Sequence, residues 1–254
     1  YVNKNKDKII IATGDTQQLR PIEAITNQFD YKYYLNFCAD QIFPNQIFLE
    51  DIKRIKDPVQ KELAKQIYDK ILNCKTAEER EELVEQCFEF IPHVIHDYNV
   101  AYKNTTCKNV SLKVRKIKGI KQEYILGDIL ICRVRFQHKK TIFNKNYKYV
   151  VSGISDKNIT LDNEHEVPIA TVRNNFIYEY CRTAHQLQGK SIDKPITIFD
   201  WKFHRVTNEW LYVAISRCTN LKNVSFHCYD EPDECDILLN QYFFNKVENY
   251  RKQD

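Results

Sequence analysis

The chain has 254 residues, of which 43% are hydrophobic, and this is enough for one or two packed domains. No apolar run approaches the roughly 20 residues of a membrane-spanning helix, and nine cysteines without a CxxC pair or a signal peptide predict reduced thiols inside a cell rather than a disulfide framework. The net charge of +4 is mildly basic and neither supports nor excludes nucleic acid as a partner.

The first 50 residues predict part of an α/β domain. Residues 8–13 form an apolar run that is typical of a buried parallel strand, and Asp15 follows it as a turn residue or helix cap. An aromatic-rich segment at 31–37 is either core or a surface on which bases stack, and 47–49 predicts a strand that leads to Arg54. Because the chain contains no Met, even at its first position, we expect it to be a piece of a longer protein.

Two helices, a strand and a third helix are predicted next. Residues 61–72 repeat apolar side chains at helical spacing. Thr76, with Glu79 three residues later, predicts a capping box at the start of the second helix. A strand at 94–102 then leads to a helix that begins at Asn104.

Between residues 124 and 172 the pattern changes to a period of two, with turn residues between short runs. Several short strands over about 50 residues predict a small inserted β-barrel. This segment carries a basic face, which is either solvated surface or a contact for phosphates, and consists of Lys139, Lys140, Lys145 and Lys148.

The stretch 183–217 concentrates polar side chains at the ends of predicted elements. Residues 176–180 lead into it and predict a strand of the main sheet. A polar turn, a buried strand at 196–199 and a short apolar helix follow. We expect them to hold a set of polar groups at the rim where open α/β sheets bind ligands, namely Thr183, His185, Gln188, Asp200, Ser216 and Arg217.

The same stretch contains a relaxed phosphate-loop pattern, in which Ala184 is followed by Gly189, Lys190 and Ser191. A true P-loop opens into a helix whose N–H groups face the phosphate. Pro195 and a strand-like run follow instead, so we do not expect a helix to start at Lys190.

Three ordered motifs resemble those of superfamily 1 helicases. Residues 14–21 (GDTQQLRP) are similar to motif III, residues 183–189 (TAHQLQG) to motif V, and residues 213–217 (VAISR) to motif VI. The Thr-x-His-x-x-Gln-Gly form resembles the PIF/RecD branch, superfamily 1B. Arg54, five residues after Leu49, matches the place of the motif IV arginine in this family.

The resemblance implies an α/β fold, with a RecA-like parallel sheet flanked by helices and an inserted small SH3-like β-barrel. It also implies domain boundaries. Residues 1–50 would end the first RecA-like domain (1A), residues 51–120 and 173–254 would form the second (2A), and residues 121–172 would be the inserted subdomain (2B).

The resemblance assigns roles to three groups of residues. The catalytic group comprises an arginine finger, an assisting arginine and a phosphate-sensing glutamine, which are Arg217, Arg54 and Gln18. The nucleotide-binding group is Gln188, Gly189 and Asp15. The nucleic-acid-binding group is Thr183, His185, Asn104, Lys139 and Lys140.

Structural roles remain open for several of these side chains. Arg217 could pair with a helix end, His185 could be a buried core histidine, and Asn104 could be only a helix cap. Cys228 and Cys235, with the adjacent His227, could be zinc ligands, but their spacing favours ordinary thiols and we predict no metal site.

The implied function is the C-terminal part of an ATP-dependent 5′→3′ DNA helicase that translocates on single-stranded DNA and unwinds duplex. ATP and Mg²⁺ would be its cofactors, with ligands mostly from an upstream half, and single-stranded DNA and replication proteins its partners. The nucleus, the cytoplasm or a viral replication site would be its location. The alternatives are a non-catalytic nucleic-acid-binding fragment, a degenerate helicase paralogue, and an RNA helicase of the same superfamily.

Overall fold

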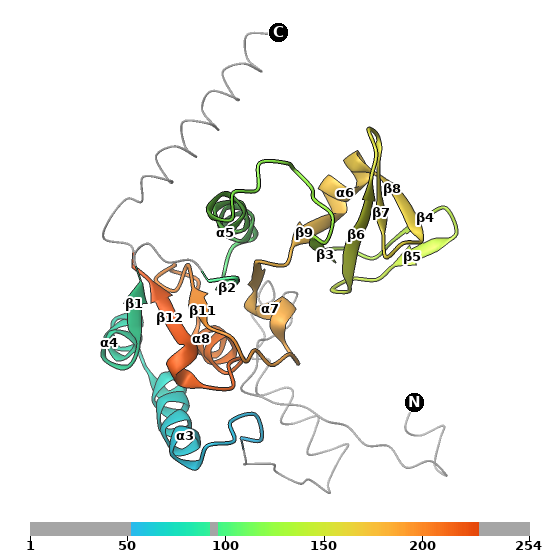
Figure 1. The fold of residues 1–254 in the computed structure, drawn as a ribbon. Helices are drawn as coiled ribbons and strands as arrows, with labels where there is room; N and C mark the ends of the chain where they lie inside the picture. Colours follow the sequence, from blue (N-terminus) through green and yellow to red (C-terminus); the bar gives the residue numbers. More distant parts are fainter. Residues whose placement is uncertain (1–51, 92–95, 229–254) are drawn as a thin grey trace, which may run out of the picture.

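The computed structural model describes residues 52–91 and 96–228 (Figure 1). The predicted elements before residue 52 lie outside the described residues, and so do Asp15 and Gln18. In the part that the structure describes, no helix combines the length and apolar character of a membrane span.

Five short strands form a parallel sheet in the order β1-β12-β11-β2-β10. They are β1 (Glu89–Ile91), β2 (Tyr98–Ala101), β10 (Cys181–Thr183), β11 (Ile196–Ile198) and β12 (Val224–His227). The central strand β11 is buried along its whole length, as expected when both faces of a parallel sheet are covered.

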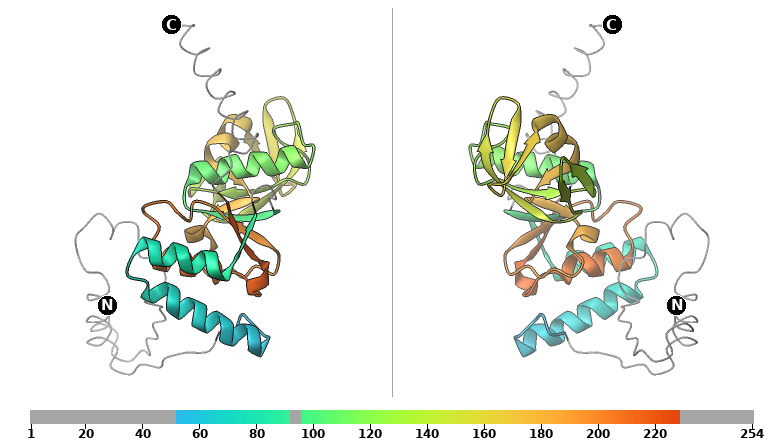
Figure 2. Two further views of the ribbon diagram at one scale, coloured as in Figure 1. Left: turned by 90° about the vertical axis from the view of Figure 1, so that its left-hand side faces the viewer. Right: turned by 90° about the vertical axis from the view of Figure 1, so that its right-hand side faces the viewer.

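Helices cover both faces of this sheet (Figure 2). One face packs against α3 (Pro58–Asn73), α4 (Ala77–Cys87) and α8 (Asn208–Ile215), and the other against α5 (Asn104–Ile117). The short elements α7 (Ala184–Leu187) and η2 (Leu221–Asn223) complete this part. The prediction of a parallel sheet flanked by helices is therefore confirmed.

Local signals fix where the first two helices begin. The Asp57 side chain accepts a hydrogen bond from Gln60 N at 2.7 Å, and Pro58 occupies the first turn of α3. Thr76 caps α4 by accepting from Glu79 N at 3.2 Å. The Glu79 carboxylate accepts from Lys75 N rather than from Thr76 N, so the reciprocal half of the predicted capping box is shifted by one residue.

A second, antiparallel sheet has the order β8-β7-β6-β3-β9, beside a two-stranded hairpin of β4 and β5. The bounds are β3 (Ile129–Cys132), β4 (Phe136–His138), β5 (Thr141–Phe143), β6 (Lys148–Ile154), β7 (Asn158–Leu161), β8 (His165–Pro168) and β9 (Phe176–Tyr178). Among the described residues, this pairing leaves β8 and β9 as edges, so the closed SH3-like barrel stays a prediction.

Two predictions in this region were wrong. Residues 176–178 form β9, which pairs with β3 in the second sheet and not with the main sheet, because Phe176 packs in the aromatic core of the second sheet. The strand pattern that we expected to continue to residue 172 ends at Pro168, and α6 (Ile169–Asn175) follows. Proline cannot donate to a strand ladder, and this explains the early end.

Candidate functional site

The loop after α7 is joined to the end of α8 through the backbone. Ile192 N donates to Arg217 O at 2.8 Å, and Thr219 N donates to Ile192 O at 2.9 Å, which forms a parallel bridge between Ile192 and Cys218. Both segments precede their strands, β11 and β12, so this junction lies at the amino end of the parallel sheet. The segment that follows motif V and the last residue of motif VI are thus brought together.

Arg54 reaches the same junction from the chain before α3. Its Nε donates to Ser191 Oγ at 2.8 Å, and its Nη1 donates to the carbonyl oxygen of Ser216. No carboxylate in the described part of the chain forms an ion pair with Arg54. The guanidinium charge therefore remains available for an anion at this place.

Arg217 lies beside Arg54 but is buried. Its Nε donates to Val213 O at 3.0 Å and its Nη2 to Ser216 Oγ at 2.9 Å, with only 3% of the residue exposed. These bonds hold a cation on the last turn of α8, where helix carbonyls favour positive charge. In this conformation Arg217 makes the helix-end contacts that the sequence left open as its structural role.

The two guanidinium charges influence the pKa values of buried neighbouring side chains, Tyr68 and Cys218. Burial raises the pKa of the Tyr68 phenol and Tyr212 raises it further, whereas Arg54 and Arg217 lower it. Burial also raises the pKa of the Cys218 thiol to about 12, against the opposing charge of Arg54. The phenol and the thiol are therefore neutral near pH 7, and neither offsets the two positive charges.

Thr183 lies at the opposite, carboxyl end of the sheet. It is the N-cap of α7, since Gln186 N donates to Thr183 Oγ1 at 3.4 Å and Thr183 N donates to Gln186 Oε1 at 3.1 Å. The expectation of one shared rim was therefore wrong. Thr183 and Arg217 lie at opposite ends of the strands because the chain reverses direction between β10 and β11.

His185 occupies the short helix that follows. Its Nε2 is buried and has no hydrogen-bond partner among the described residues. Burial lowers the pKa of its imidazole, so the ring is neutral near pH 7. A neutral ring can stack on a base or exchange a hydrogen bond with a ligand, but it does not add a positive charge.

The turn after α7 depends on a glycine. Gly189 has φ +77°, a left-handed conformation that other residues rarely adopt, and it is exposed. Gln188 caps the end of α7 and is half-buried. No helix begins at Lys190, and this agrees with our rejection of the phosphate-loop pattern.

Asp200 is a functional-site candidate whose role the sequence did not reveal. It follows β11 with φ +60° and caps α5 from outside, because its carboxylate accepts from Lys103 N at 2.9 Å and from Thr106 Oγ1 at 3.0 Å. Asn104 is the first residue of α5, exposed, and the cap residue Lys103 makes no side-chain cap bond. The cap role that the sequence left open for Asn104 is therefore not found, because Lys103 holds the N-cap position.

Replacing Asp200 with Ala should lower the free energy of unfolding by about 1–2 kcal/mol, because two donors lose their acceptor and Ala tolerates positive φ poorly. Asp200→Asn keeps an acceptor and tolerates this backbone, so it should lose less. Urea unfolding of the two variants measures the difference. Equal losses would contradict the capping role.

The predicted basic face is divided among different environments. Lys139 and Lys140 lie at the exposed turn between β4 and β5, and Lys139 Nζ is 3.9 Å from Glu166 Oε2. Lys148 instead forms an ion pair with Glu179, at the start of the return to the main sheet. These lysines therefore do not form one uniform surface.

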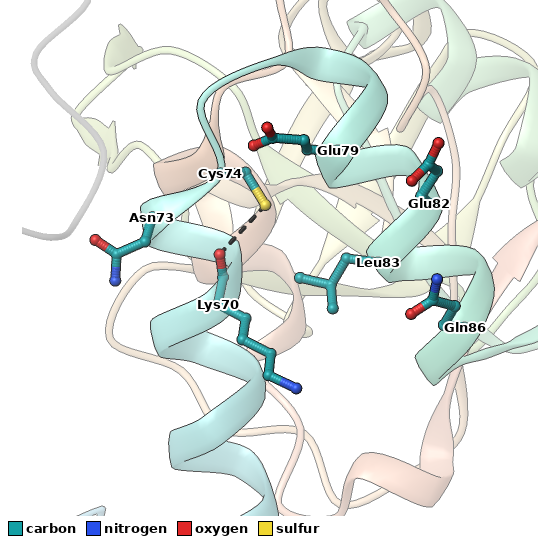
Figure 3. Close-up of a pocket in the computed structure, with 7 residues that line it drawn as sticks. All are labelled: Lys70, Asn73, Cys74, Glu79, Glu82, Leu83 and Gln86. Atoms are coloured by element: carbon teal, nitrogen blue, oxygen red, sulfur yellow. Dashed lines mark hydrogen bonds between the residues drawn. The ribbon is translucent and has the colours of Figure 1, made fainter.

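Two other features lie outside the site. The described residues contain no cluster of three or more His, Cys, Asp or Glu that could hold a metal ion, and Cys235 is not among the described residues. An open hollow between α3 and α4 is lined by none of the predicted site residues (Figure 3). Its lining consists of Lys70, Asn73, Cys74, Glu79, Glu82, Leu83 and Gln86.

Comparisons with known proteins find matches among solved structures, all at low sequence identity. No protein-family model matches, and no curated protein sequence matches. Among solved structures, the Pif1 helicase double mutant from Bacteroides is 17% identical, covering 92% of this chain and 66% of that one, with a TM-score of 0.44. The Bacteroides Pif1 complex with ADP-AlF3 and ssDNA is 16% identical, covering 79% and 56%, with a TM-score of 0.39.

Pif1 helicase from Candida albicans is 10% identical, covering 77% of this chain and 59% of that one, with a TM-score of 0.36. The chain thus spans between about half and two thirds of the length of the structures it matches.

Proposed function

We propose that this chain is the C-terminal part of an ATP-dependent DNA helicase of superfamily 1B that translocates 5′→3′ on single-stranded DNA. The observation that carries the proposal is the pair of bonds from Arg54 to Ser191 and Ser216, because it joins the arginine at the motif IV place to the loop after motif V and to the end of motif VI. Three segments that are far apart in sequence thereby form one positively charged place.

The chemistry of this place suits phosphoryl transfer. Negative charge that develops on a transferring phosphate is stabilised by preorganised guanidinium groups, which can hold two oxygens at once. Arg54 and Arg217 would bind the phosphates of ATP, with Gln188 and Gly189 at the adjacent turn and Gln18 and Asp15 from the upstream segment. The P-loop and the Mg²⁺ ligands would come from residues before this chain.

The opposite end of the sheet supplies the proposed nucleic-acid contacts. Thr183 ends β10, His185 follows it in α7, and Asn104 follows β2; the carboxyl ends of these two strands are adjacent in the sheet. His185 has a buried Nε2 without a hydrogen-bond partner in the described ranges 52–91 and 96–228, which is the kind of group that a ligand can satisfy. Lys139 and Lys140 would contact the phosphates of the strand. We also propose the domain boundaries that the motif resemblance implies for 1A, 2A and 2B.

A non-catalytic nucleic-acid-binding role is the second candidate. The observation that favours it is the burial of Arg217, two of whose donors bond Val213 and Ser216 at the end of α8. A finger of an active enzyme must turn outward when the nucleotide-binding half closes onto it.

The chain purified alone should bind single-stranded DNA in a salt-dependent manner and hydrolyse no ATP at a useful rate. The intact protein should hydrolyse ATP with Mg²⁺, and single-stranded DNA should stimulate the rate. ATPase assays on both, with DNA and RNA oligonucleotides compared, test the proposal. Binding without hydrolysis by the intact protein would favour the non-catalytic role, and stimulation by RNA alone would favour an RNA helicase.

A further inference from the structure

Ion pairs join Lys148, Glu179 and Arg182 where the second sheet meets the parallel sheet, and Lys190 interacts electrostatically with all three. Lys148 begins β6, Glu179 lies between β9 and β10, Arg182 is in β10, and Lys190 follows α7. A backbone bond also links Glu179 to the second sheet, since Glu179 N donates to Ile129 O of β3 at 3.1 Å. We call these four residues the junction cluster.

One carboxylate oxygen binds two of the three cations. Arg182 Nη2 lies 2.8 Å from Glu179 Oε1, and Lys148 Nζ pairs with the same oxygen. Lys190 forms no ion pair with any described residue. The junction cluster therefore contains three cations and a single anion, a surplus of two positive charges.

This surplus lies in a partly desolvated place. The Arg182 side chain is only 5% exposed, and that of Glu179 is 10% exposed. Burial lowers the pKa of the Lys190 ammonium, the charges of Arg182 and Lys148 lower it further, and Glu179 opposes them. Like charges so arranged repel one another, and a bound anion would relieve the repulsion.

The cluster is open on one side. The Lys148 side chain is 47% exposed, and Lys190 is half-buried next to the exposed Gly189. Both ammonium groups can therefore reach an anion from solvent, whereas Glu179 holds the buried Arg182 in place as a positioning residue. A phosphate, with several negatively charged oxygens, can accept from all three cations.

We propose that Lys148, Arg182 and Lys190 form a binding site for a backbone phosphate of single-stranded DNA, where the strand passes from the second sheet to the turn at 183–189. This rests on the proposed function of the chain. The alternative source of the phosphate is a nucleotide, because Ser191, which follows Lys190, contacts Arg54. The DNA strand is favoured because Lys148 belongs to the second sheet, which also carries Lys139 and Lys140.

The test uses the full chain and a fluorescent oligothymidylate, with binding measured by anisotropy over a series of salt concentrations. Lys190→Gln and Lys148→Gln should each weaken binding about tenfold at low salt. Each should also reduce the slope of log affinity against log salt by about 0.7. The matched control is Lys157→Gln, an exposed lysine in the turn between β6 and β7, which should change neither quantity.

Thermal melting separates binding from folding. Removing Lys190 relieves repulsion, so Lys190→Gln should not lower the melting temperature, and Lys190→Arg should keep both the charge and the binding. Wild-type binding that the Lys190 and Lys148 variants leave unchanged would overturn the junction cluster but not the proposed function. No binding by the wild type would overturn both. If the Lys190 and Lys148 variants lost ATP binding while the slope of log DNA affinity against log salt stayed unchanged, the bound phosphate would belong to a nucleotide. This result would overturn the proposal.

Discussion

Arg217→Lys in the intact protein should lower the rate of ATP hydrolysis by about 10³ to 10⁵ while ATP and single-stranded DNA still bind. An ammonium group cannot copy the planar fork of a guanidinium on two phosphate oxygens. The interaction matters mainly in the transition state, where charge develops, so the effect appears in kcat rather than in ground-state affinity.

The burial of Arg217 adds a stability effect that must be separated from catalysis. Its fork bonds Val213 O and Ser216 Oγ, and a lysine can replace only part of this. Hydrogen bonds to charged groups contribute about 1.5–3 kcal/mol each, so the melting temperature should also fall. Hydrolysis must therefore be measured well below the melting temperature of the variant, together with nucleotide affinity.

Arg205→Lys is a suitable control, since Arg205 is exposed just before α8. It should keep both activity and melting temperature. If Arg217→Lys retained more than about a tenth of wild-type turnover, the finger assignment would be abandoned. A fall in activity only in proportion to the unfolded fraction would give Arg217 a purely structural role.

Elements that are determined by short-range signals could be predicted from the sequence. The helical stripe of α3 and the cap of α4 at Thr76 depend on residues within a few positions of one another. β9 belongs to the second sheet because Phe176 packs against Phe143 and Tyr149, which lie more than 25 positions earlier in the chain. Single-sequence periodicity does not contain such a pairing.

The same limit applies to the candidate site. Motif patterns identified Arg54 and Arg217 as candidates. They did not predict that Arg54 would bond Ser191, or that Arg217 would bond Val213 of its own helix α8. The left-handed backbone of Asp200, which makes it the cap of a distant helix, gives no signal in the residue type alone. The junction cluster combines charges from β6, β10 and the turn after α7, so only the tertiary fold reveals its charge balance.

Two ion pairs are equally short, Arg115 with Asp128 and Arg173 with Glu123. Substitution in the buried pair, Arg115 with Asp128, should destabilise the protein more. Arg115 Nη1 lies 2.5 Å from Asp128 Oδ1, and these side chains are 3% and 2% exposed. The pair also binds the backbone, since Arg115 donates to Gln122 O and Glu123 O, and Asp128 accepts from Ile125 N. These bonds join α5 to the segment that enters the second sheet.

Asp128→Asn should lower the free energy of unfolding by about 3–5 kcal/mol, because it leaves the buried Arg115 without a counter-charge. The matched control is Arg173→Ala. Arg173 also pairs with Glu123 at 2.5 Å, but its side chain is 58% exposed, so its removal should lower the free energy of unfolding much less than Asp128→Asn does. Urea unfolding of both variants measures the contrast.

A double variant, Arg115→Met with Asp128→Leu, isolates the reason for the loss. It removes both charges and fills similar volume, so it should recover much of the stability that Asp128→Asn loses. Recovery would mean that Asp128→Asn destabilises the protein because it leaves the buried charge of Arg115 unpaired, and not because the attraction between the two groups is lost. Equal losses in Asp128→Asn and Arg173→Ala would instead show that burial does not control the strength of this connection between α5 and the second sheet.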